Sequence, residues 1–159
     1  MVSIAAVLDS TCLIGLENIG RLDIVEQFLQ PAYDPPAVEQ EFGAKPPWLQ
    51  IVVPADKALV TSLQMMVDAG EAEAITLALE MGVRIILDDR KAREVAMRLG
   101  VQVTGTLGLL LKAKEAGIIS PIKPILTELE SNHFHIAPRL MLEALRLARE
   151  ATDAATTDY

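Results

Sequence analysis

Arg84-Ile85-Ile86-Leu87-Asp88-Asp89 is the most informative segment of the chain. Its apolar run has no polar alternation, which is typical of a strand that is buried on both faces of a parallel sheet. Ile4 to Leu8 forms a second run of this kind, and Val101-Gln102-Val103 is a third predicted strand. Helical patterns separate the three runs, and strands that alternate with helices indicate a parallel sheet covered on both faces. The sequence therefore predicts an α/β fold.

The remaining elements follow from apolar periodicity and from the glycines and prolines that interrupt it. Short strands are expected at residues 32–33 and, as a sheet edge or a connection, at residues 49–53. One domain is predicted over residues 1–152, and residues 153–159 are predicted to form a flexible tail. Helices are expected over residues 11–19, 22–29, 35–42, 56–66, 71–81, 88–99, 106–116, 121–130 and 138–150.

The composition excludes several classes of protein. Apolar residues make up 51% of the 159 residues, which excludes a disordered chain. The formal net charge is -8, so nucleic acid can bind only through a local basic patch or through metal ions. A single cysteine, Cys12, excludes an intrachain disulfide, and no apolar run approaches the ~20 residues of a membrane span. Asp9 interrupts the apolar N-terminus too early for a signal peptide, so a soluble cytoplasmic protein is expected.

Acidic side chains follow two of the predicted strands at the point where each strand ends. Asp9 comes directly after Leu8, and Asp88 and Asp89 come directly after Leu87. Ligands of open α/β sheets bind outside the carboxyl ends of the strands, and adjacent strands ~4.8 Å apart would bring these carboxylates close together. Such like charges repel, raise one another's pKa and call for a hard cation, Mg²⁺ or Mn²⁺. The alternative is that each aspartate only caps the helix that follows it.

Two pairs of glutamates can extend this cluster. Glu39 and Glu41 lie on the helix after a double proline, and Glu71 and Glu73 lie in the first turns of a long helix. Residues two apart point in roughly opposite directions on a helix, so at most one member of each pair can face the aspartates. Asp68 and Glu71 have the spacing of a capping box, which gives Glu71 a structural role. Glu73 has no evident structural partner, so we expect loss of Glu71 to lower stability and loss of Glu73 to lower metal binding.

Three basic residues follow the aspartate pair: Arg90, Lys91 and Arg93. Their place next to the acids fits contacts with a nucleic-acid backbone, because positive side chains position nucleic acids through their phosphates. The alternative is an ordinary solvated helix face.

Four segments, Asp9 to Ile14, Val38 to Phe42, Gly70 to Ala78 and Ile85 to Arg93, resemble in this order the motifs of the PIN-domain family. Val103 to Leu110 resembles the segment that follows these motifs in an uncharacterised PIN-like branch found in bacteria and archaea. Phe134 to Leu140 is similar to the C-terminal segment of that branch. The resemblance therefore covers nearly the whole chain.

The resemblance implies a three-layer α/β/α sandwich with a mainly parallel sheet and a ribonuclease activity that depends on Mg²⁺ or Mn²⁺. Asp88 is the alternative to Asp89 as a ligand, because Leu87 stands where the motif usually has threonine. The metal-binding and catalytic acids that the motifs imply are Asp9, Glu41, Glu73 and Asp89, with Ser10 and Thr106 as supporting hydroxyls.

Many proteins that the chain resembles are VapC-type toxins of toxin–antitoxin pairs, which a small antitoxin silences and which are often dimeric. The resemblance thus implies RNA as the substrate, a small antitoxin as a partner and a homodimer as one expected assembly.

Three other functions compete with the nuclease. A catalytically silent PIN-like module that only binds a protein partner stays open. A phosphoacceptor receiver domain needs an acidic pair after its first strand, where Asp9 stands alone. A dinucleotide-binding domain needs a G-x-G-x-x-G segment after that strand, and the chain has none there.

Overall fold

A sheet of five parallel strands forms the centre of the molecule within residues 3–150, the part of the chain that the computed structural model describes. Across the sheet the strands lie in the order β3 (Leu49–Ile51), β2 (Ala32–Asp34), β1 (Ala6–Leu8), β4 (Arg84–Ile86) and β5 (Val103–Thr104). The central strand, β1, is completely buried, as its unbroken apolar run predicts.

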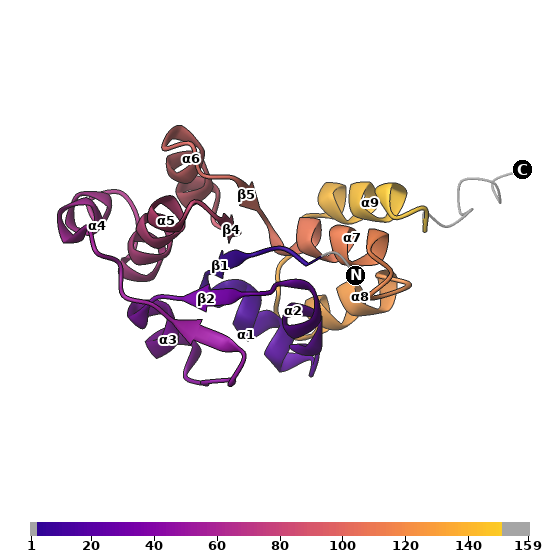
Figure 1. Cartoon of the computed structure of the whole chain (residues 1–159). Helices are drawn as coiled ribbons and strands as arrows, with labels where there is room; N and C mark the ends of the chain where they lie inside the picture. The colour runs from indigo at the N-terminus through magenta and orange to yellow at the C-terminus, as the bar shows by residue number, and fades with distance from the viewer. Residues whose placement is uncertain (1–2, 151–159) are drawn as a thin grey trace, which may run out of the picture.

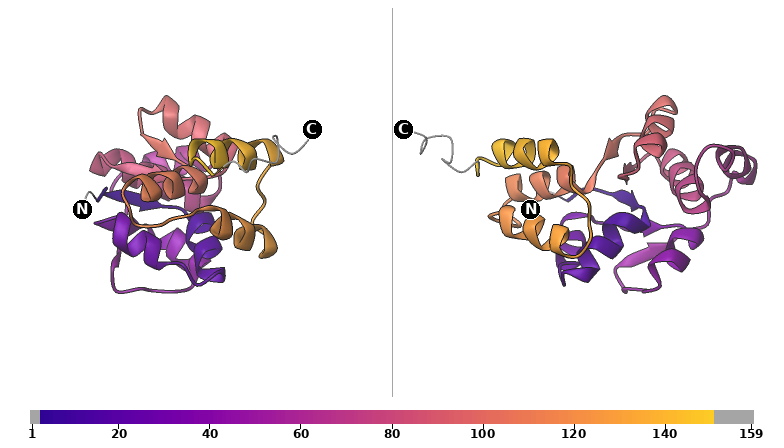
Figure 2. Two further views of the ribbon diagram at one scale, coloured as in Figure 1. Left: turned by 90° about the vertical axis from the view of Figure 1, so that its right-hand side faces the viewer. Right: turned by 180° about the vertical axis from the view of Figure 1, so that it is seen from behind.

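Helices flank this sheet on both sides. They are α1 (Ser10–Asn18), α2 (Asp23–Phe28), α3 (Pro36–Phe42), α4 (Lys57–Leu63), α5 (Ala69–Met81), α6 (Arg90–Arg98), α7 (Thr106–Glu115), α8 (Lys123–Ser131) and α9 (Pro138–Leu147). Figure 1 shows α4, α5 and α6 on one side of the strands and α7, α8 and α9 on the other, and Figure 2 shows the same separation from behind. The predicted three-layer α/β/α sandwich is therefore confirmed. Between residues 3 and 150, no helix combines the length and the apolar character needed to cross a membrane.

The element boundaries differ from the predicted ones by at most three residues. The strand β5 begins at Val103 rather than Val101 because the backbone N–H of Val101 donates to the carbonyl of Ala96 at 3.0 Å and closes the end of α6. The left-handed conformation of Gly100, with φ of 82°, makes this turn possible. The tail predicted at residues 153–159 lies outside the described residues.

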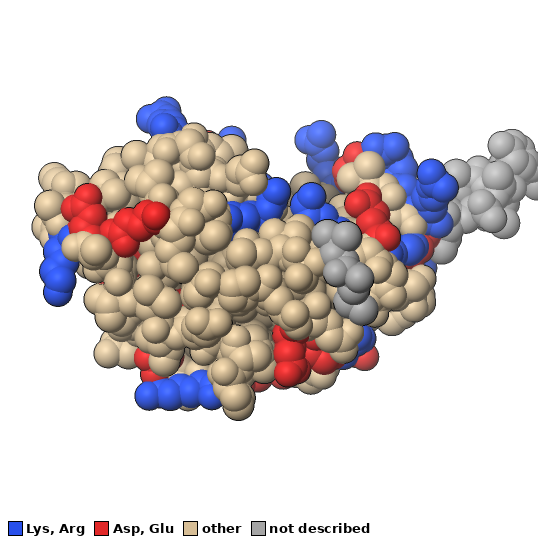
Figure 3. Space-filling model, in the orientation of Figure 1, with Lys and Arg blue, Asp and Glu red and all other residues tan. Residues whose placement is uncertain are grey.

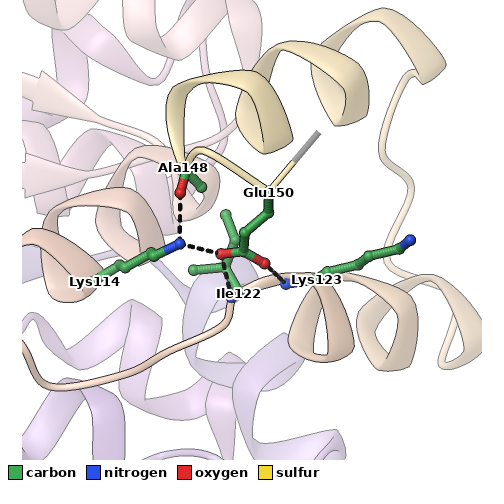
Figure 4. A network of polar contacts seen from close by, with 5 residues as sticks. All are labelled: Lys114, Ile122, Lys123, Ala148 and Glu150. Atoms are coloured by element: carbon green, nitrogen blue, oxygen red, sulfur yellow. Dashed lines mark hydrogen bonds and ion pairs between the residues drawn. The ribbon is translucent and has the colours of Figure 1, made fainter. Parts of the chain in front are cut away.

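The last described residue, Glu150, joins three helices. The predicted helix over 138–150 ends at Leu147, and the chain then turns so that the Glu150 carboxylate lies beside α7 and α8 (Figure 4). It accepts hydrogen bonds from Lys114 Nζ at 2.6 Å, Ile122 N at 2.9 Å and Lys123 N at 3.0 Å. We call this arrangement the Glu150 clamp, and it holds α9 against the two preceding helices.

The register of the strands gathers acidic residues at one edge of the sheet. Leu8 pairs with Ile86, so the chain leaves β1 and β4 at the same level. The backbone N–H of Asp9 donates to the Ile86 carbonyl at 3.1 Å, which extends this pairing by one residue. The first strand-end aspartate therefore lies next to the segment that carries Asp88 and Asp89.

Candidate active site

Asp9 is the buried centre of the candidate site. Its side chain is 5% exposed, and although Asp9 occupies the N-cap position of α1, its carboxylate makes no capping hydrogen bond. The alternative that Asp9 only caps a helix is therefore wrong. Burial raises the pKa of Asp9 to about 7; a backbone hydrogen bond from Ser10 opposes this shift, and the charges of Glu41, Asp68 and Asp88 add to it.

The two consecutive aspartates have different neighbours. Asp88 accepts hydrogen bonds from the backbone N–H of Thr106 at 2.8 Å and from its hydroxyl at 2.5 Å, so Thr106 holds this carboxylate as the motif resemblance implies. Asp89 accepts from the backbone N–H of Ala92 at 3.0 Å and caps α6. Asp89 therefore caps its helix while its charge acts on Glu71, whereas the charge of Asp88 acts on Asp9.

Glu41 reaches the site from α3. Its Oε2 atom accepts a hydrogen bond from Ser10 Oγ at 2.9 Å, which is the contact expected of a supporting hydroxyl. A Cβ atom at Gly70 would lie 2.1 Å from Glu41 Oε1, so the absence of a side chain at this position leaves room for the carboxylate. The same Cβ would lie 3.6 Å from Asp68 Oδ1. Glu41 therefore lies against the start of α5, beside Asp68.

The capping box at the start of α5 is confirmed, and it leaves one carboxylate oxygen unused. The backbone N–H of Glu71 donates to Asp68 Oδ1 at 2.8 Å, and the backbone N–H of Asp68 donates to Glu71 Oε1 at 3.2 Å. The other oxygen, Glu71 Oε2, is buried without a hydrogen-bond partner. Burial raises the pKa of Glu71 to about 8, with further contributions from its hydrogen bond with Asp68 and from the charges of Asp68 and Asp89. Glu71 therefore faces the acids.

Glu73 points to a different part of the molecule. Its Oε1 atom accepts a hydrogen bond from the backbone N–H of Ala37, in the first turn of α3, at 3.2 Å. The prediction that Glu73 lacks a structural partner is therefore wrong. Two residues on a helix differ by about 200° in direction, so a helix that turns Glu71 toward the aspartates turns Glu73 toward α3.

A buried acid that the sequence reading missed ends β2. Asp34 is 0% exposed, and neither of its carboxylate oxygens has a hydrogen-bond partner. Burial raises its pKa to about 7, and the charge of Glu39 adds to the shift. The sequence contains a signal for it, because Asp34 directly follows the strand predicted at residues 32–33, as Asp9 directly follows the one that ends at Leu8. Asp68 was also read only as a cap, although its charge acts on Asp9.

We call the acids that surround Asp9 the acidic edge. Within residues 3–150, no three His, Cys, Asp or Glu side chains lie close enough together to hold one metal ion as they stand. The donor chemistry nevertheless fits Mg²⁺ or Mn²⁺, because every donor is a carboxylate oxygen and Glu71 Oε2 has no other partner. The members of the acidic edge are Asp9, Glu41, Asp68, Glu71, Asp88 and Asp89.

The three basic residues after the aspartate pair differ in how they meet the site. Arg93 is half-buried, and its Nη1 atom donates to the carbonyl of Leu87 at 3.0 Å. Arg90 is exposed and forms a loose ion pair with Glu94 at 3.8 Å. Both arginines line a hollow that Asp88 also lines, whereas Lys91 does not line it. Of the three predicted RNA contacts, Arg90 and Arg93 therefore lie at this hollow, and Lys91 lies outside it.

The comparison with protein families finds a match over nearly the whole chain. The family model DUF3368, described as a PIN domain, matches residues 5–150, which include every strand and helix described above. No curated protein matches the chain. The matched span contains the complete acidic edge.

Proposed function

The chain belongs to the PIN-domain family, whose members are generally nucleases, and on this premise we propose that it is a cytoplasmic endoribonuclease dependent on Mg²⁺ or Mn²⁺. The observation that carries the proposal is Asp9, a carboxylate that is buried at a strand end, makes no capping bond and lies within the field of three other acids. A divalent cation would offset the burial and the repulsion that together raise its pKa.

The proposed metal ligands are Asp9, Asp88, Glu41 and Glu71, with Asp89 as a further candidate. Glu71 replaces Glu73 in this set because its Oε2 atom is free, while Glu73 is bound to α3. A bound Mg²⁺ or Mn²⁺ supplies an activated water and stabilises charge on the phosphate. Ser10 orients Glu41 through its 2.9 Å hydrogen bond.

The chain's own residues would position the substrate. Thr106 fixes the Asp88 carboxylate through two hydrogen bonds, so this side chain cannot turn away when a phosphate arrives. Arg93, held by the Leu87 carbonyl, would face a substrate phosphate and offset the negative field of the acidic edge. Hydrolysis adds water to the phosphorus atom and breaks one phosphorus–oxygen bond, so no Ser, Cys or His nucleophile is needed.

Substitution of Asp9 tests this proposal. We expect Asp9→Asn to lower Mn²⁺-dependent cleavage of single-stranded RNA at least about a hundredfold, or roughly 2.7 kcal/mol of activation free energy. Its melting temperature should be unchanged or higher, because the substitution removes a buried charge. Glu17→Gln, on the exposed face of α1, is the control and should cleave as the wild type does. Unchanged cleavage by Asp9→Asn in the presence of EDTA would overturn the mechanism.

We propose further that this nuclease is the toxin of a toxin–antitoxin pair. A protein of net charge -8 that cleaves RNA would be controlled by a small protein with a basic surface, because charge complementarity speeds association and selects partners. Expression of the protein alone should slow growth, and co-expression with a small neighbouring reading frame should restore it. Harmless expression of protein that cleaves RNA in vitro would contradict this role. The homodimer stays a prediction.

A second candidate is a catalytically silent PIN-like module that binds a protein partner. The observation that favours it is the spacing of the acids, since no three of the described side chains converge on one point. Titration with Mn²⁺ separates the two candidates. Metal binding that is lost in Asp9→Asn and is accompanied by cleavage supports the nuclease, and a folded protein that neither binds Mn²⁺ nor cleaves RNA supports the silent module.

A further inference from the structure

A hollow lined by basic side chains lies next to the acidic edge, between β4, β5 and α7. Its volume is about 600 Å³, and four of its lining residues are cations that come from three different elements. Figure 3 shows Lys and Arg atoms, in blue, in the depression between the part of the molecule that carries α6 and the part that carries α7 and α9. We call it the basic hollow, and its cations are Arg84, Arg90, Arg93 and Lys112.

Neutral groups hold two cations of the basic hollow, Arg84 and Arg93, whereas Arg90 pairs loosely with Glu94. Arg84 donates from Nη1 to Thr104 Oγ1 at 2.6 Å and from Nη2 to Gln102 Oε1 at 3.3 Å, and its Nε atom is buried without a partner. Arg93 donates to the carbonyl of Leu87. Among residues 3–150, no Asp or Glu forms an ion pair with Arg84, Arg93 or Lys112.

What distinguishes these three cations is that they converge on one hollow. The chain has 22 Asp and Glu against 14 Lys and Arg, yet none of these acids forms an ion pair with them among the described residues. Like charges that share a partly buried space repel one another, and an anion that enters the space relieves the repulsion. Three unpaired cations in one hollow therefore indicate a site for an anionic ligand.

The other walls of the hollow indicate the size and chemistry of that ligand. Val103, Leu107 and Leu140 supply an apolar surface beside the cations. A volume of about 600 Å³ accommodates one nucleotide but not the width of a duplex. Cations beside an apolar wall suit a nucleotide, whose phosphate is anionic and whose base presents an apolar face.

The basic hollow opens onto the acidic edge. Asp88 lines both, and Gly105 lies between the two. A Cβ atom at Gly105 would lie 2.7 Å from Arg93 Nη1 and 3.0 Å from Asp88 Oδ1, so glycine leaves open the passage between the arginine and the aspartate. A chain that occupied the hollow would therefore continue toward Asp88.

From this arrangement we propose that the basic hollow binds the nucleotide adjacent to the scissile phosphate of a single-stranded RNA. Arg84 and Lys112 hold its phosphate, and Leu107 and Leu140 contact its base or sugar. This inference rests on the proposed nuclease function, because it assigns the position of the neighbouring nucleotide relative to the acidic edge. It adds Arg84 and Lys112 to the RNA contacts and leaves Lys91 out.

Binding measured without cleavage tests the proposal. Fluorescence anisotropy in EDTA would follow a short labelled single-stranded RNA of mixed sequence, with wild-type protein, Arg84→Gln and Lys112→Gln. Each substitution removes one phosphate contact, so each should weaken binding severalfold and lower the slope of log affinity against log salt by about 0.7. The matched control is Arg98→Gln, an exposed position in the last turn of α6 outside the hollow, which should retain the wild-type slope.

The outcomes separate this proposal from the nuclease itself. Wild-type affinity and slope in both variants would overturn the basic hollow even if cleavage still depends on Asp9. Arg84 also bridges to β5, so Lys112→Gln decides the result if Arg84→Gln melts at a much lower temperature. If RNA binding needs both Arg84 and Lys112 but the wild type does not cleave RNA in Mn²⁺, the RNA site in the basic hollow is supported and the nuclease function is contradicted. An oligoglutamate peptide that binds more tightly than the RNA would overturn the proposal in favour of a protein partner.

Discussion

The acidic edge and the Glu150 clamp use the same chemical group in opposite ways. In the clamp, one carboxylate receives three hydrogen bonds, one of them from the ammonium group of Lys114 (Figure 4). Burial acts to raise the pKa of Glu150, but these donors outweigh it and lower the pKa. At the acidic edge none of the six carboxylates forms an ion pair with a described Lys or Arg, and burial raises the pKa of Asp9 and of Glu71.

This difference distinguishes acids that stabilise the fold from acids that await a ligand. A carboxylate whose donors come from the protein is already neutralised, and its loss costs stability. A buried carboxylate without donors destabilises the folded chain, and its retention suggests a role for an added cation. Three substitutions can break or sharpen this contrast.

The largest expected effect is on catalysis, at the start of α5. Glu71→Gln should lower Mn²⁺-dependent cleavage about a hundredfold, or roughly 2.7 kcal/mol, because it removes the free oxygen that faces the acids. Its melting temperature should change little at pH 7, since glutamine also completes a capping box. This expectation reverses the one drawn from sequence alone.

Glu73→Gln is the matched control two residues away. It should cleave RNA at nearly the wild-type rate, because the Glu73 carboxylate contacts the backbone of Ala37 rather than the acidic edge. The measurement is the cleavage rate and the melting temperature of both variants. An inactive Glu73→Gln beside a fully active Glu71→Gln would show that the ligand assignment is wrong.

The second-largest expected effect is on the free energy of unfolding, at the Glu150 clamp. Glu150→Gln should lower the free energy of unfolding by about 2 kcal/mol, because hydrogen bonds to a charged group are weakened. For a chain of this size that corresponds to a fall of about 4–8 °C in Tm, with cleavage retained.

The pH dependence of this loss follows from the lowered pKa of Glu150. The folded-state pKa lies below the unfolded value of about 4.3, so the stabilisation is complete above about pH 4.3 and is lost as the pH falls through the folded value. Glu143→Gln, in the exposed pair with Arg146 on α9, is the control and should leave Tm unchanged. Equal Tm values for Glu150→Gln and Glu143→Gln at pH 7 would show that the Glu150 clamp does not stabilise the fold.

The smallest effect is at Asp34, a buried acid without donors that lies at the same edge of the sheet. Its folded-state pKa of about 7 lies above the unfolded value of about 3.9, so the folded chain holds this proton more tightly. The destabilisation is absent below about pH 4, grows as the pH rises and is complete above about pH 7. Asp34→Asn should therefore raise the free energy of unfolding at pH 8 by about 1 kcal/mol, and by less at pH 5. Urea unfolding at the two pH values measures this, and an equal change at both would contradict the buried charge.

Local patterns predicted most of the fold because each depends on a few adjacent residues. The apolar run before Asp88 forms a strand wherever both faces are covered, and Pro36 and Gly43 mark the ends of α3 through their own backbone preferences. The capping box of Asp68 and Glu71 is likewise readable from spacing. The predicted start of β5 is wrong because a hydrogen bond from Val101 to the preceding helix competes with the strand.

The site was only partly readable for a different reason. Strand-end position identified Asp9 and Asp88, but it was not applied to Asp34, because the strand predicted before it has only residues 32–33. The choice between Glu71 and Glu73 depends on the rotation of α5 against α3, which spacing within one helix leaves undetermined. The choice between Asp88 and Asp89 likewise depends on Thr106, 18 residues further along the chain.

The amino-acid sequence by itself determined the parallel sheet, the strand-end acids and the cap of α5, because these follow from the periodicity and chemistry of neighbouring residues. The tertiary structure decided which carboxylates share a field and which receive donors, as the contrast between Asp9 and Glu150 shows. It also brought Arg84 and Lys112 into one hollow. Charges interact through space, so their effect depends on distances that only the packing of remote segments sets.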